Sequence, residues 1–154
     1  MKSKAMMTVL ASCLLCGLVL ADADKKGAKD ASAIQGTWQV VTHEVGDRPS
    51  DDPASHRLVF ERESFRLMEG EQQVAKGTFK LDPSRTPHTI DMEITESSEP
   101  DAQGKTALGI YEVKDNKLTW CSAQPGSDQR PTTFAARGTQ NLLATLKRAA
   151  AEKK

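Results

Sequence analysis

The side chains best suited to metal or acid–base chemistry are three histidines, and they are widely spaced. His43, His56 and His88 lie 13 and 32 residues apart, whereas zinc-binding elements place paired ligands within about five residues of each other. Strands can bring distant histidines together, but the sequence shows no converging set of ligands with supporting hydrogen-bonding groups. We therefore expect neither a metal site nor a bound cofactor.

Carboxylates and nucleophiles give no catalytic pattern either. Asp47, Asp51 and Asp52 lack the regular spacing and the glycine of a calcium-binding loop. No Gly-x-Ser-x-Gly turn places a serine for nucleophilic attack. Glu93 and Glu96 fall on an outward face and at a strand end, which is typical of carboxylates that serve solubility. The sequence therefore predicts that the protein is not an enzyme and has no catalytic residues.

Two further polar groups are interpreted as structural. Cys121 lies between Trp120 and Ser122 in a β-rich segment with no adjacent base, so we expect a small buried side chain rather than a reactive thiol. Arg130 begins the motif Arg130-Pro131-Thr132, and we expect its guanidinium to hold backbone carbonyls at the rim of a barrel.

Short β-strands must position these residues, because apolar and polar side chains alternate along most of the chain. Ile90, Met92 and Ile94 alternate with charged residues, which is the period-two pattern of a half-buried strand. Glu61-Arg62-Glu63 and Asp115-Asn116 indicate tight turns between strands. The segments expected to form strands are Thr37–Val45, His56–Arg62, Ser64–Glu69, Gln73–Leu81, His88–Thr95, Lys105–Lys114, Lys117–Ala123, Thr132–Ala135 and Asn141–Lys147.

This pattern predicts an all-β fold. Short strands joined mostly by hairpin-length turns favour a meandering antiparallel sheet, and closing that sheet into an up-and-down barrel of about eight strands removes its exposed edges. Two longer loops, Gly46–Pro53 and Ser97–Gly104, are expected at the mouth of the barrel, where recognition is usually placed.

The first 21 residues are typical of a cleavable secretory signal peptide. Lys2 and Lys4 precede an uncharged, mostly apolar stretch that ends at Ala21, directly before Asp22. The stretch is shorter than the ~20 apolar residues that span a bilayer comfortably, so no membrane span is expected after the signal is removed. We expect the protein to be secreted or periplasmic.

A lipid anchor on Cys13 is the alternative to a freely exported protein. Leu10-Ala11-Ser12-Cys13 fits a lipid-attachment box. Cleavage there would leave the apolar residues 14–20 on the mature protein without an evident role, which favours cleavage after Ala21.

Four segments follow from this organisation: a signal peptide over residues 1–21, a charged linker over 22–33, the β-domain over 34–148 and a polar tail over 149–154. The linker is small, charged and aperiodic, which is typical of a solvated tether. Without the signal peptide the chain keeps 133 residues, with 19 basic and 21 acidic side chains. That length predicts one domain, that charge balance offers no footprint for nucleic acid, and we expect a monomer.

Several runs of residues give the domain a family resemblance. Gly36-Thr37-Trp38 resembles the Gly-x-Trp that opens the first strand of lipocalins. Further runs are Leu58-Val59-Phe60-Glu61, Gly77-Thr78-Phe79-Lys80-Leu81-Asp82-Pro83, Gly104-Lys105-Thr106, Gly109-Ile110-Tyr111-Glu112 and Arg130-Pro131-Thr132. Together these runs resemble a lipocalin-like domain family of planctomycete bacteria, although the chain departs from that family at Arg62-Glu63 and at Ser122.

The resemblance implies a small lipocalin-type barrel on an exported protein, and it carries over no catalytic or binding residue. Lipocalins commonly lay an arginine of the last strand across the tryptophan of the first strand. The resemblance therefore implies a contact between Arg148 and Trp38, with Trp38 plugging the closed end of the barrel.

Two functions remain open at this point. The barrel is either a binding module that holds one small apolar molecule, or a filled structural module that contacts another protein of the cell envelope. Interior volume separates the two, since side chains can fill an eight-stranded barrel or leave room for one ligand. The candidate pocket residues are Phe65, Phe79, Met92, Tyr111 and Trp120.

We expect the mature protein to begin at Asp22 or Asp24, because an alanine precedes each of these residues after the apolar stretch. Intact mass spectrometry of the protein secreted by its own host measures this start. A full-length chain, or a lipid-modified N-terminus at Cys13, would contradict the prediction.

Overall fold

A computed structural model describes residues 18–150 of the chain, with side chains from residue 25 onward. Residues 1–17, which contain most of the expected signal peptide, lie outside the described residues, as do residues 151–154 of the expected polar tail. The elements are α1 (Leu18–Ile34), β1 (Gly36–Val45), β2 (Arg48–Pro49), the 3-10 turn η1 (Pro53–Ser55), β3 (His56–Glu61), β4 (Ser64–Glu69), β5 (Gln72–Asp82), β6 (His88–Ser97), β7 (Thr106–Lys114), β8 (Lys117–Ser122) and β9 (Leu142–Arg148).

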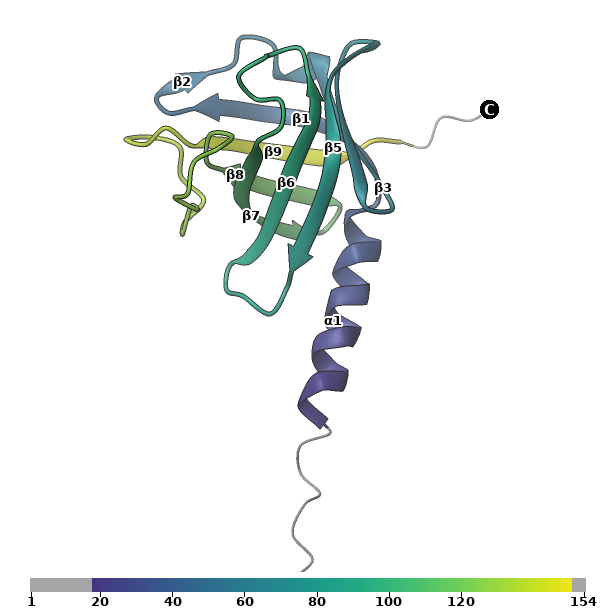
Figure 1. The fold of residues 1–154 in the computed structure, drawn as a ribbon. Helices are drawn as coiled ribbons and strands as arrows, with labels where there is room; N and C mark the ends of the chain where they lie inside the picture. The colour runs from purple at the N-terminus through teal and green to yellow at the C-terminus, as the bar shows by residue number, and fades with distance from the viewer. Residues whose placement is uncertain (1–17, 151–154) are drawn as a thin grey trace, which may run out of the picture.

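Eight of the strands form a closed antiparallel barrel, which confirms the predicted fold class (Figure 1). From β3 onward each strand pairs with the next along the chain, and β1 pairs with β3 on one side. The barrel closes where β9 returns to β1, from Trp38 opposite Arg148 to Val45 opposite Leu142. The two-residue strand β2 pairs only with the last two residues of β1.

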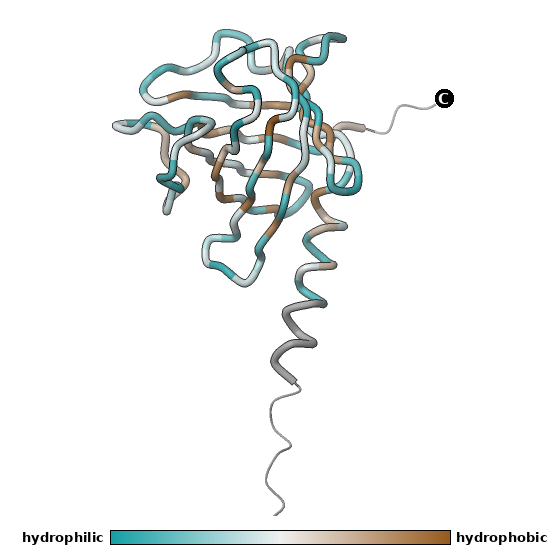
Figure 2. Tube along the Cα trace, viewed as in Figure 1, coloured by the Kyte–Doolittle hydropathy of each residue, from teal (hydrophilic) through white to brown (hydrophobic). Residues whose placement is uncertain are grey.

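The tight turns of the barrel form without glycine where the sequence indicates. Arg62 has a φ of 57°, and the two turn residues Asp115 and Asn116 have φ values of 52° and 59°. Aspartate and asparagine tolerate this left-handed conformation because their short side chains can bond to the local backbone. Figure 2 shows that apolar residues lie mainly on the strands and that hydrophilic residues lie at most turns.

One end of the barrel is filled by large side chains. Trp38, Phe60, Phe79 and Tyr111 are all buried there, and the rings of Phe60 and Phe79 pack edge to face with their centroids 4.9 Å apart. Ile34, the last residue of α1, is fully buried against them. We call this the closed end, and the opposite end, where β6 joins β7, the mouth.

The expected strand over Thr132–Ala135 is wrong. Residues 123–141 form an irregular connection between β8 and β9, and this connection is fastened to the outer wall of the barrel. Thr132 and Thr133 are exposed and pair with no strand, and the connection is buried against the wall at the flanking residues Pro131 and Ala136.

The expected solvated tether over residues 22–33 is also wrong, because these residues are helical and belong to α1. Alanine and lysine, which are common in this segment, are strong helix formers. Tertiary contacts fix the C-terminal half: the carboxylate of Asp30 accepts a hydrogen bond from the Tyr111 hydroxyl at 2.8 Å and lies 2.8 Å from Nδ1 of His88. Figure 1 shows the rest of α1 pointing away from the barrel.

Within the described residues, no helix combines the length and the apolar character needed to cross a membrane.

Arg148, in the last strand of the barrel, contacts both the first strand β1 and the end of α1. Its guanidinium lies 4.3 Å from the centre of the Trp38 ring, and it donates hydrogen bonds of 2.6 Å to the carbonyls of Ala33 and Gln35. A cation at the C-terminus of a helix also complements the helix dipole. Glycine suits position 36, because φ is 104° and a Cβ there would lie within 3.1 Å of the guanidinium.

Replacing this arginine should therefore loosen the closed end. For Arg148→Met we expect the free energy of unfolding to fall by about 2–4 kcal/mol, since a cation–π contact and two charge-assisted hydrogen bonds are lost. Urea titration followed by tryptophan fluorescence measures the change. Lys147→Met, at the exposed neighbouring position, is the control and should be close to neutral. Equal effects of the two substitutions would contradict the role given to Arg148.

Candidate functional site

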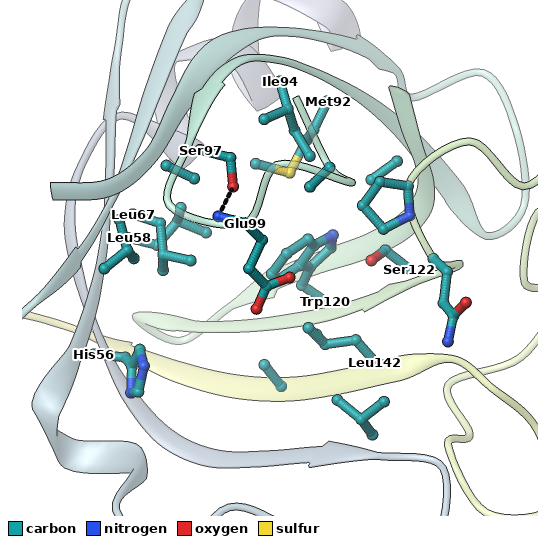
Figure 3. Close-up of a pocket in the computed structure, with 18 of the residues that line it drawn as sticks. His56, Leu58, Leu67, Met92, Ile94, Ser97, Glu99, Trp120, Ser122 and Leu142 are labelled. Carbon is teal, nitrogen blue, oxygen red and sulfur yellow. Dashed lines mark hydrogen bonds between the residues drawn. The ribbon is translucent and has the colours of Figure 1, made fainter. Parts of the chain in front are cut away.

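The mouth half of the barrel contains a cavity of about 710 Å³. Drug-sized ligands typically occupy pockets of about 300–1,000 Å³, so this space suits one small molecule. Figure 3 shows the cavity with side chains from several strands pointing into it. The interior is therefore neither hollow throughout nor filled throughout, because the closed end is packed and the mouth half is open.

The wall of the cavity is mostly apolar. Leu58 and Leu67 contribute from neighbouring strands on one side, and Met92 and Ile94 contribute from β6 (Figure 3). Leu58 and Leu67 lie directly opposite each other in the β3–β4 register, and Met92 and Ile94 are two residues apart in β6. Side chains at such positions point to the same face of a sheet, so the period-two pattern of the strands produces the apolar lining. Small residues such as Ala144 complete the wall and keep the space open.

Trp120 forms the largest aromatic surface of the cavity. Its indole lies against β7 at Gly109, where a Cβ would come within 3.1 Å of the indole nitrogen and 2.9 Å of the Cys121 carbonyl oxygen. Glycine at this position therefore allows the ring to lie close to the wall. The indole N–H is buried and has no hydrogen-bond acceptor among the described residues.

Two histidines line the cavity near its mouth. The rings of His43 and His56 have centroids 6.2 Å apart, and Glu69 lies opposite His56 in the β3–β4 register. Burial lowers the pKa of His43, and the nearby His56 lowers it further. Among residues 18–150, no three histidine, cysteine, aspartate or glutamate side chains are grouped so that they could hold a metal ion.

The loop between β6 and β7 places polar groups over the cavity. Ser97, Ser98, Glu99 and Asp101 all line it. The loop is held to β5, where the Ser98 N–H donates to the Val74 carbonyl at 2.8 Å, and by a local bond from the Glu99 N–H to the Ser97 hydroxyl at 3.0 Å. These groups therefore sit on a fixed loop of the mouth.

Three of the five residues expected to line a pocket do so. Phe65, Met92 and Trp120 belong to the cavity wall. Phe79 and Tyr111 do not, because both lie in the packed closed end. The Tyr111 hydroxyl instead bonds to Asp30 of α1, and burial together with this bond raises its pKa far above the ordinary value. The alternation of strand residues predicted that all five face inward but not how far each lies from the mouth.

Cys121 and Arg130 lie on the outer wall, away from the cavity. Cys121 is fully buried beneath the β8–β9 connection, its sulfur lies 3.7 Å from the Ala135 carbonyl oxygen, and burial raises the pKa of the thiol. Arg130 donates to the Gly109 carbonyl at 2.9 Å and pairs with Asp91 at 2.7 Å. The guanidinium thus binds carbonyls, but at the middle of β6 and β7 and not at a rim.

Sequence reasoning missed the polar part of the cavity. His56 is in phase with Leu58 and Phe60, so its inward direction could have been inferred from alternation alone. His43 could not, because a bulge after Val40 reverses the phase of β1. Of the two expected mouth loops, Ser97–Gly104 contributes to the cavity wall, and Gly46–Pro53 does not.

Comparison with known proteins finds no match for this chain among protein-family models, curated proteins or solved structures.

The lowered pKa of His43 predicts a loss of stability in acid. Its ordinary pKa is 6.5, and the folded state holds it lower, so below pH 6.5 the unfolded chain binds a proton that the folded chain resists. His43 therefore does not lower the free energy of unfolding above pH 6.5, and it lowers this free energy progressively as the pH drops through and below that value.

His43→Gln should flatten this dependence. We expect the difference in unfolding free energy between pH 7.5 and pH 5 to be smaller in the variant than in the parent protein, measured by urea titration at both pH values. His88 remains in both proteins and so cancels in the comparison, whereas the effect that His56 exerts on His43 is lost together with the His43 ring. An unchanged difference would contradict the assignment.

Proposed function

We propose that this protein is an exported binding module that holds one small apolar or amphipathic molecule in the mouth half of its barrel. The observation that carries the proposal is the cavity of about 710 Å³ with an apolar wall and polar groups at its mouth. Burying the apolar part of a ligand there gains roughly 0.8 kcal/mol per CH₂ group. The polar mouth residues would then meet the hydrated part of the ligand.

The shape of the barrel supports binding over a purely structural role. A filled barrel would offer only its surface and loops to a partner, but here packed side chains occupy the closed end alone. A strand-built wall is rigid, so little conformational entropy is lost when a ligand enters. The Ser55 hydroxyl lies 3.0 Å from Nδ1 of His56, but Ser55 is outside the cavity lining, and no serine of the lining is paired with a histidine, which supports binding rather than catalysis.

A substitution that fills the cavity should reduce binding without unfolding the barrel. Ala144 lines the cavity from β9, whereas the next residue, Thr145, faces the outer side of the same strand. We expect Ala144→Leu to weaken the binding of a neutral environment-sensitive dye such as Nile red at least about fivefold, which corresponds to roughly 1 kcal/mol. Fluorescence titration measures the affinity and the stoichiometry.

Thr145→Leu is the matched control, since it adds an apolar side chain to the same strand without entering the cavity. It should leave the affinity for the dye unchanged. If the intact parent protein binds no dye at one-to-one stoichiometry, or if both variants lose binding equally, the carrier function is wrong and a protein-interaction role takes its place.

A further inference from the structure

The polar groups at the mouth indicate what kind of molecule the cavity takes. This inference rests on the proposed binding function and concerns the chemistry of the ligand head group. The cavity wall below the mouth is apolar, so the head group is the part that must meet charge. The titratable groups that line the cavity are His43, His56, Glu69, Glu99, Asp101 and Lys105.

In Figure 3 the side chain of Glu99, an exposed residue of the mouth, extends over the cavity. Its side chain leaves the β6–β7 loop and points inward, toward Trp120. The backbone of Glu99 is fixed on both sides, since its N–H donates to Ser97 and its carbonyl accepts from Ala102 at 3.1 Å. Among the described residues, no lysine, arginine or histidine nitrogen lies within 4.0 Å of its carboxylate.

Carboxylates outnumber ammonium groups in the cavity lining. Glu69 and Asp101 are two further carboxylates of the cavity lining, against a single ammonium group, that of Lys105. The Lys105 stem lies along Gly126 of the β8–β9 connection, where a Cβ would be 2.8 Å from its Cδ. The pKa of His43 is lowered, so this ring is neutral at pH 7 and adds no positive charge.

Trp120 adds a second preference for positive charge. The face of an indole ring attracts cations, and Trp120 presents its ring to the same cavity that Glu99 enters. A carboxylate and an indole around an apolar space are complementary to a protonated amine that carries an apolar tail. An anionic head group would meet three carboxylates, and a neutral one would leave the Glu99 carboxylate without a counter-charge.

We infer that the cavity binds a cationic amphiphile, with the ammonium group of the ligand held at Glu99 over Trp120 and its apolar tail between the walls of the barrel.

Three eight-carbon probes with different head groups test the inference. Octylamine, 1-octanol and octanoate are titrated into the purified protein at pH 7 by calorimetry, each in the parent protein and in Glu99→Gln. We expect octylamine to bind about five- to tenfold more tightly than 1-octanol in the parent protein. Glu99→Gln should remove most of this preference and leave the affinity for 1-octanol unchanged.

Glu93→Gln is the control, because Glu93 is an exposed carboxylate on the outer face of β6. It should leave both affinities unchanged. If 1-octanol or octanoate binds as tightly as octylamine, or if the preference survives in Glu99→Gln, the cationic ligand is wrong while the carrier function stands. If none of the three probes binds, the carrier function fails, and this inference fails with it.

Discussion

The stacking of Arg148 on Trp38 joins the last strand of the barrel, β9, to the first strand, β1. A helix leaves its last carbonyl groups without partners, and the last residue of α1, Ile34, is fully buried at the closed end of the barrel. The Arg148 guanidinium donates to the carbonyl of Ala33, and the Trp38 indole N–H donates to the carbonyl of Ile34 at 2.7 Å. The side-chain amide of Gln35 donates to the carbonyl of Ala31. Residues from the first and last strands thus cap the helix, and the same contacts hold β1 beside β9, so that the barrel stays closed.

Closing one end in this way determines where a cavity can form. The largest aromatic side chains gather near Trp38, which leaves mainly leucine, methionine, isoleucine and alanine for the mouth half. Phe65 and Trp120 are the exceptions, and Gly109 lets the Trp120 ring lie against the wall. The barrel therefore packs most of its large aromatic side chains at one end and keeps room for a ligand at the other.

Alternation along the chain predicted the barrel well, because a half-buried strand shows its two faces in the sequence itself. The expected and observed bounds of β4 agree, and the tight turn at Arg62 formed without glycine. What the sequence could not show was depth along the barrel axis, which separates Phe65 in the cavity from Phe79 in the packed end. A one-residue bulge likewise hid the direction of His43, and the contacts by which Asp30 anchors the helix over residues 22–33 to the barrel have no signal in the sequence.

The position of α1 has a consequence for orientation. The helix contains 17 residues, which gives it a length of about 25 Å at 1.5 Å per residue. It enters the barrel at the closed end, so its axis leads away from the side that carries the cavity entrance. A mature chain that begins at Asp22 keeps residues 22–34 of this helix, so whatever is attached at that end would lie on the side opposite the cavity entrance and would leave the entrance open.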